Sequence, residues 1–208
     1  MSPKPRHKSI RQKFERKIQE NKDINKLRIK GGFLDIEYVK DILTNDEIKI
    51  LLKEDFLTMD DELLDDWCVV IHSYRRKSYA ILIMEDMADS INQLDKDDRT
   101  LDDEALFNEP FVISNSYNFP WKSANPGIAN VLERAQWIIP PRLSSSFHQT
   151  FPPERFRFPF IQEPKMIGYG SFGAVNEVKI AEGHIEFSEG YDSVSNPMKL
   201  SPKKTVCA

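Results

Sequence analysis

The apolar positions between residues 34 and 94 recur at the spacing of an α-helix. They predict a short helix over residues 34–43 and a longer one around residues 68–94, where the apolar positions alternate at steps of four and three. The stripe of the longer helix consists of Ala80, Met84, Met87, Ile91 and Leu94. We expect this stripe to form the core of a small helical domain rather than a docking surface for a partner helix.

A further helix is predicted to begin near Asn45. Asp46 and Glu47 occupy its first turn, where acidic side chains favour the positive end of the helix dipole, and Asn45 is expected to cap the free amides. The apolar face of this helix consists of Ile48, Ile50, Leu51 and Leu52.

Residues 1–32 are dominated by Lys, Arg, Asn and Gln. The apolar positions of this segment, which are too sparse to predict a strong core face, are Phe14, Ile18, Ile24 and Leu27. We therefore expect residues 1–32 to form a basic tail, flexible or helical, ahead of a helical domain over residues 33–107. Its basic cluster is expected to be solvated rather than a targeting signal.

Prolines interrupt the pattern over residues 108–157, which predicts a connector rather than a domain. Large aromatic side chains are scattered between the prolines, and they are expected to anchor an extended segment against a neighbouring domain. These aromatic residues are Phe119, Trp121, Trp137, Phe147 and Phe151.

The net charge of −4 over 208 residues gives no electrostatic reason to expect nucleic acid or an anionic membrane as a partner. No signal peptide or membrane-spanning run is apparent. The two cysteines, Cys68 and Cys207, have no companions at metal-ligand spacing. These features predict a cytoplasmic or nuclear protein with neither a zinc site nor a disulfide framework.

The most informative motif is the run from Gly168 to Val175, which reads GxGxxGxV. Glycines at this spacing allow backbone amides to approach phosphate oxygens closely and permit a tight turn. The residues that follow, 174–180, are rich in β-branched side chains and end before Gly183. The motif is therefore predicted to be the tip of a hairpin, whereas the dinucleotide-binding turn leads into a helix. A Walker A loop is excluded because no Gly-Lys-Ser/Thr is present.

With these flanks, the segment resembles the start of a eukaryotic-type serine/threonine protein kinase domain, over roughly the last 50 residues. The Pro-Phe pair before the first strand and the long polar insertion after the second, from Glu182 to Pro202, resemble a group of fungal kinases with helical N-terminal extensions. The resemblance implies an α+β chain with a helical N-terminal region, a proline-rich connector and the first antiparallel strands of a kinase small lobe over residues 158–208. It also implies ATP as the ligand, with magnesium in the complete domain, and Ser/Thr of protein substrates as acceptors.

The same resemblance assigns roles to individual residues. Ile167 and Val175 would contact the adenine, and the amides of Ser171, Phe172 and Gly173 would face the phosphates. The full set implied to bind nucleotide is Ile167, Gly168, Tyr169, Gly170, Ser171, Phe172, Gly173, Val175 and Ala208.

Ala208 enters this set as the alanine of the third-strand Val-Ala-Ile-Lys motif, whose lysine would then lie two positions further on. Lys199 is an alternative strand lysine, disfavoured because Pro197 removes an amide from the ladder. The catalytic HRD, DFG and APE motifs do not occur in the sequence. We therefore assign no catalytic or metal-binding residue, and we expect an inactive, truncated fragment whose C-terminal third is disordered or prone to aggregate.

Other candidate sites are weaker. Residues 95–100 superficially resemble a calcium loop but lack its turn glycine and its bidentate glutamate, so an acidic turn is expected. The four histidines form no triad with a serine or cysteine. The acidic set predicted to form an exposed helix face is Asp60, Asp61, Glu62, Asp65 and Asp66. The alternative function is a noncatalytic protein-interaction module, in which the helical region binds a partner and the kinase-like tail is vestigial.

Overall fold

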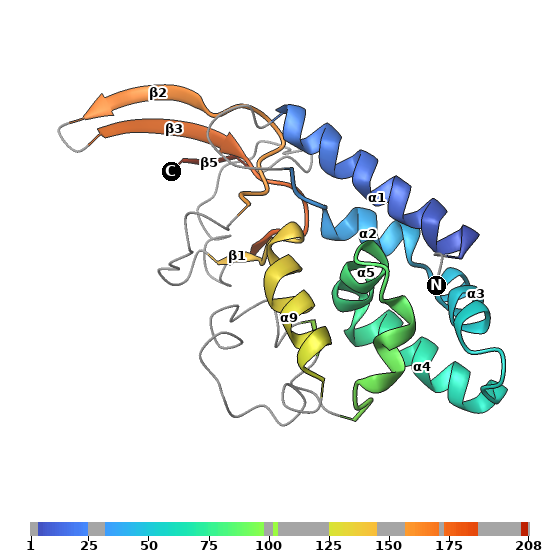
Figure 1. The fold of residues 1–208 in the computed structure, drawn as a ribbon. Helices are drawn as coiled ribbons and strands as arrows, with labels where there is room; N and C mark the ends of the chain where they lie inside the picture. Colours follow the sequence, from blue (N-terminus) through green and yellow to red (C-terminus); the bar gives the residue numbers. More distant parts are fainter. Residues whose placement is uncertain are drawn as a thin grey trace, which may run out of the picture.

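The fold combines a helical body with a small sheet, and is therefore α+β. The computed structural model describes residues 4–24, 32–97, 102–103, 125–144, 157–170, 173–186 and 205–207. The helices gather on one side of the molecule, and a two-stranded hairpin extends away from them (Figure 1). None of the helices in these ranges is long and apolar enough to cross a bilayer.

Helix α1, Pro5–Ile24, belongs to the helical body. Ile10 and Phe14 lie one turn apart and are both buried, with Phe14 fully enclosed. The Arg6 guanidinium pairs with the Glu47 carboxylate of α3 at 2.7 Å, which fixes the helix from its polar side. The expectation that the apolar residues here are too sparse for a core face was wrong. Two apolar side chains on one face are enough when an apolar helix lies against them.

Three helices follow, and each begins at a side-chain cap. Asp35, Thr44 and Asp60 each accept a hydrogen bond from an amide two or three residues further on. The cap of the second of these helices is thus Thr44, whereas we predicted Asn45, which is its first helical residue. The predicted exposed acidic face after Asp60 is confirmed. The helices are α2, Ile36–Ile42, α3, Asn45–Asp55, and α4, Asp61–Tyr74.

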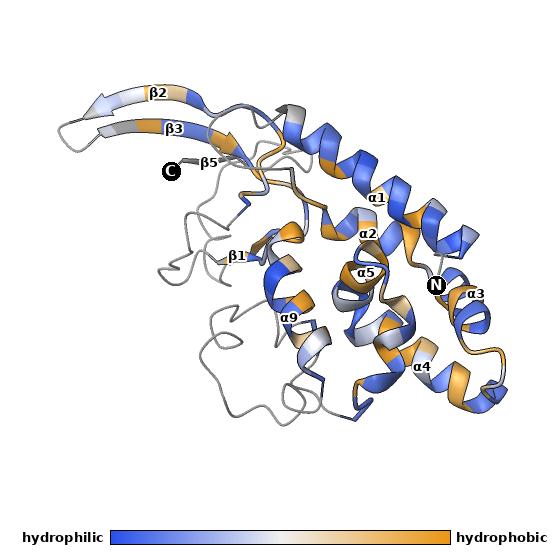
Figure 2. Ribbon diagram, viewed as in Figure 1, coloured by the Kyte–Doolittle hydropathy of each residue, from blue (hydrophilic) through white to orange (hydrophobic). Residues whose placement is uncertain are grey.

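The long helix predicted over residues 68–94 is broken twice. Arg75 interrupts it with a φ of −129°, and Asp86 has a left-handed φ of 57°. Between these breaks α5, Arg76–Met84, is buried along almost its whole length and lies at the centre of the helical body (Figure 2). A short 3-10 helix, η1, Ala88–Gln93, follows. An apolar stripe alone does not distinguish one long amphipathic helix from a buried helix between two turns.

Part of the predicted connector belongs to the helical core. Helix α9, Pro126–Ala135, packs against α5 through Ile128 and Leu132, and the 3-10 turn η3, Gln136–Ile138, places Trp137 in a buried position. The prediction that Trp137 anchors its segment is confirmed, although the segment is helical rather than extended. The other four aromatic residues of that prediction lie outside the described residues.

The strands form two small sheets. Strands β2, Lys165–Gly170, β3, Gly173–Lys179, and β5, Thr205–Cys207, form an antiparallel sheet in the order β2-β3-β5. Strands β1, Leu143–Ser144, and β4, Ile185–Glu186, form a short parallel pair. Because β1 follows α9 and β4 follows β3, this pair joins the hairpin to the helical body.

Candidate functional site

The glycine motif lies at the tip of the β2–β3 hairpin, as predicted. Gly168 is opposite Val175, Tyr169 is opposite Ala174, and Gly170 is opposite Gly173. The strand after the last glycine continues to Lys179 with no helix opening in the motif. This is the strand-turn-strand arrangement that separates the motif from a dinucleotide-binding turn. Ser171 and Phe172, the two residues that complete the tip, lie outside the described residues, as do Lys199 and Ala208.

The two side chains predicted to contact adenine are neighbours on an open surface. A bulge separates Met166 from Gly168 in the pairing, so Ile167 is the extra residue beside the Gly168–Val175 pair. Ile167 is 51% exposed and Val175 is 42% exposed. These two side chains and the ring of Tyr169 are thus exposed on a hairpin that extends away from the helical body (Figure 1).

The two outer glycines of the motif are constrained differently. Gly173 has a φ of +135°, a backbone conformation that residues other than glycine rarely adopt. Gly168 has an ordinary conformation, and a Cβ atom added there would meet nothing within 4 Å. Packing within the chain thus does not explain a glycine at position 168. The space above its backbone is open to a ligand.

The root of the hairpin is held by backbone contacts. The Ile161 amide donates to the Lys179 carbonyl at 2.9 Å, and the Ala181 amide donates to the Pro159 carbonyl at 2.8 Å. Phe158 stacks on the ring of Phe160 with centroids 5.1 Å apart. These contacts join the segment before β2 to the end of β3, so the tip extends from a fixed base.

His184 connects this base to the helical body. Its Nε2 accepts a hydrogen bond from the Ile36 amide at 3.2 Å, and its ring meets Phe33 edge to face. Burial, together with the neighbouring positive charge of Lys77, lowers the pKa of His184 to about 3. The ring is therefore neutral at physiological pH, as an acceptor Nε2 requires. Sequence reasoning found no role for this histidine, because its partner lies 148 positions away.

A second group that the sequence did not reveal lies at the junction of α4 and α5. Charged side chains from four parts of the chain converge there on a cavity, including Lys77 and Asp103, which are far from the glycine hairpin in sequence. No local spacing predicts this cluster, because tertiary packing brings its members together. No group of metal-ligating side chains occurs within the part of the chain that the structure describes.

Comparison of the chain with models of known protein families, with curated proteins and with solved structures gives no match.

Proposed function

We propose that the β2–β3 hairpin is the nucleotide-covering glycine loop of a protein kinase small lobe, with ATP as its ligand. The observation that carries the proposal is the register of the hairpin, in which Gly170 is opposite Gly173 and Gly168 is opposite Val175 at the tip of two antiparallel strands. The open space above Gly168 supports it, because a phosphate must approach the backbone at van der Waals distance.

In this proposal each part of the hairpin has a role. Ile167 and Val175 cover the adenine, and the amides of Ser171, Phe172 and Gly173 face the phosphates. The pairing of β3 with β5 supports a third strand beside the hairpin, in which Val206 is opposite Val178. Ala208 would then follow this strand as the alanine that packs on the adenine.

Phosphoryl transfer requires groups that these 208 residues do not contain. A strand lysine must bridge the phosphates to a helix glutamate, a catalytic aspartate must accept the substrate proton, and carboxylate and amide side chains must hold magnesium. Neither HRD nor DFG occurs in the sequence, so the residues present do not fit a magnesium site. We therefore expect these residues alone to transfer no phosphate to Ser or Thr of a protein.

The decisive experiment is to sequence the transcript beyond the codon for Ala208. We expect a lysine two positions after Ala208, followed by HRD and DFG motifs at kinase spacing. The protein extended to that end should then phosphorylate a Ser/Thr substrate, and Gly170→Asp should abolish this activity through charge repulsion and blocked phosphate approach. A stop codon directly after Ala208, or a continuation without the lysine, would overturn the kinase proposal.

The alternative function, a noncatalytic protein-interaction module that uses the helical region, has less support than the kinase proposal. Leu57 and Val69 are exposed apolar side chains of the helical region, at 86% and 58% exposure. Single exposed apolar side chains are ordinary on soluble proteins and do not by themselves identify a partner. If the kinase experiment fails, capture of a partner by residues 33–107 becomes the function to test.

A further inference from the structure

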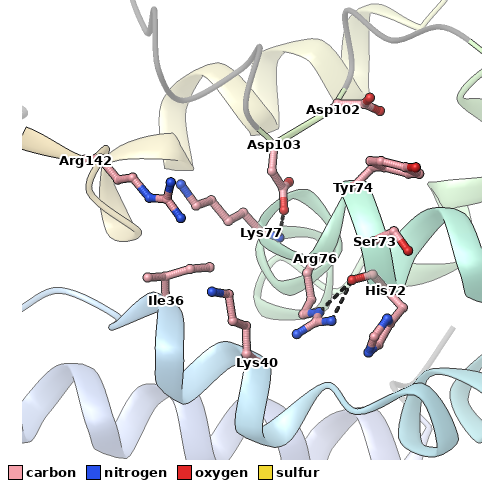
Figure 3. A pocket seen from close by; sticks show the side chains of 10 residues that line it. All are labelled: Ile36, Lys40, His72, Ser73, Tyr74, Arg76, Lys77, Asp102, Asp103 and Arg142. Carbon is pink, nitrogen blue, oxygen red and sulfur yellow. Dashed lines mark hydrogen bonds between the residues drawn. The ribbon is translucent and has the colours of Figure 1, made fainter. Parts of the chain in front are cut away.

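A cavity of about 430 Å³ lies between α2, the α4–α5 junction and the segment that leads into β1 (Figure 3). This volume falls within the range of about 300–1,000 Å³ that is typical of small-molecule sites. The charged side chains that line it are Lys40, Arg76, Lys77, Arg142, Asp102 and Asp103. Among the described residues, four cations and two carboxylates thus line the cavity.

Both carboxylates already interact with other groups of the protein. Asp103 caps the N-terminus of α5, since it accepts hydrogen bonds from the Lys77 amide at 2.6 Å, the Ser78 amide at 3.0 Å and the Ser78 hydroxyl at 3.1 Å. Asp102 lies 3.5 Å from the buried Arg75 guanidinium, which is not one of the lining cations. The negative charge of the cavity is therefore committed to the helix end and to Arg75.

Arg76 and Lys40 each have more N–H donors than their protein hydrogen bonds described below use. Arg76 uses two of its N–H groups on the His72 carbonyl, at 3.0 Å and 2.6 Å, and a guanidinium has five. Lys40 pairs with the Glu37 carboxylate at 2.7 Å, and an ammonium has three donors. Arg142 approaches from the opposite side and is exposed, so it lies where a ligand enters (Figure 3).

Lys77 is the most deeply buried of the lining cations. Burial, with the positive charges of Arg142 and Lys40 and against the opposing effect of Asp103, lowers the pKa of Lys77 to about 8. Burial also lowers the pKa of Arg76. An anion that enters the cavity would stabilise the charged forms of these cations.

We propose that this cavity binds the phosphate group of a small phosphate monoester, held by Arg76, Arg142, Lys40 and Lys77. A phosphate monoester carries a charge of roughly −1.5 to −2 at neutral pH, opposite in sign to the cations that predominate among the described lining residues. Guanidinium groups hold phosphate oxygens through paired N–H donors, and ammonium groups add point charge. This site is separate from the glycine hairpin and does not depend on the kinase proposal.

Calorimetric titration of the whole chain with inorganic phosphate, at low ionic strength, tests the site. Saturable binding is expected, and Arg142→Gln should weaken it by about tenfold or more, because a charge-assisted hydrogen bond is lost. Arg16→Gln removes one charge from an exposed arginine of α1 and should leave the affinity unchanged. Acetate, a monoanion, should bind more weakly than phosphate. Gly170→Asp in the hairpin should have no effect, which separates this test from that of the kinase proposal.

Proton uptake provides an independent readout. At about pH 8, bound phosphate should raise the pKa of Lys77, so binding should take up protons. Titration in two buffers of different ionisation enthalpy measures this uptake. Lys77→Met, in which a buried methylene chain keeps its packing, should abolish both the uptake and tight binding, while circular dichroism confirms that it folds. Four results would each overturn the proposal. The first two are that phosphate shows no saturable binding, or that Arg142→Gln and Arg16→Gln weaken phosphate binding equally. The others are that acetate binds as tightly as phosphate, or that proton uptake persists in Lys77→Met.

Discussion

The Nε2 atom of His184 accepts a hydrogen bond from the backbone N–H of Ile36 at 3.2 Å. Ile36 is the first residue of α2, so the imidazole satisfies one of the amides that a helix N-terminus leaves free, while Asp35 accepts from the Glu37 amide. The same contact attaches the root of the glycine hairpin to the helical body. One of the contacts that dock the two parts therefore depends on the protonation state of this ring.

Acid should weaken this docking. The folded pKa of His184 is about 3, below its ordinary value of 6.5, so the unfolded chain binds an extra proton between these values. Stability is then fully present above pH 6.5 and is lost as the pH falls towards 3, by about 1.4 kcal/mol for each pH unit. Urea unfolding at a series of pH values measures the slope.

Two variants identify the residue responsible for that slope. His184→Gln keeps a hydrogen-bond acceptor but does not titrate, so its acid dependence should be flatter than that of the wild type. His72→Gln, at a partly exposed histidine of α4, should retain most of the acid dependence. A wild-type slope that survives in His184→Gln would contradict the assignment.

Substitutions at two glycines of the hairpin should differ in effect. Gly173→Ala places a side chain at a φ of +135°, which costs about 1–3 kcal/mol of local strain, so hydrogen exchange of the β2 and β3 amides should accelerate. Gly168→Ala meets open space and should preserve or slightly increase protection. Equal effects of the two substitutions would show that the register at the tip differs from the one described.

Close approach of backbone segments makes Gly32 sensitive to substitution. A Cβ atom at Gly32 would lie 1.7 Å from the Ile18 carbonyl oxygen of α1. Gly32→Ala must therefore push α1 away from the core, and we expect a loss of about 3 kcal/mol in the free energy of unfolding. Gly127→Ala, in α9 with no atom within 4 Å, should instead gain about 0.5 kcal/mol from helix propensity. Chemical denaturation of both variants provides the comparison.

Alkaline pH should stabilise the fold through Lys77. Its folded pKa of about 8 lies below the ordinary 10.5, so between these values the unfolded chain holds a proton that the folded chain has released. The penalty is fully present below pH 8 and declines as the pH rises, by about 1.4 kcal/mol for each unit. Lys77→Met should be more stable than the wild type at pH 7 and should lack this rise between pH 8 and 10. The exposed control Lys165→Met should retain it.

Local signals were sufficient for the hairpin and for one surface. The GxGxxGxV spacing, followed by β-branched residues, predicted a strand-turn-strand tip, because glycines and β-branched residues restrict the backbone where they stand. The acidic run after Asp60 predicted an exposed helix face for the same local reason. The α+β class follows from these segments without reference to distant contacts.

Tertiary structure decided the rest. Phe14 is a core residue because α1 lies against other helices, and the break at Arg75 separates α4 from the buried helix α5. Asp103 caps α5 from 25 positions away, and His184 reaches Ile36 across 148 positions. Such contacts depend on which surfaces meet after folding, whereas sequence periodicity records only which residues lie on the same face of one element. The sequence alone thus determined the glycine hairpin and its predicted ligand, and only the folded chain determined the anchor at His184 and the cation-lined cavity.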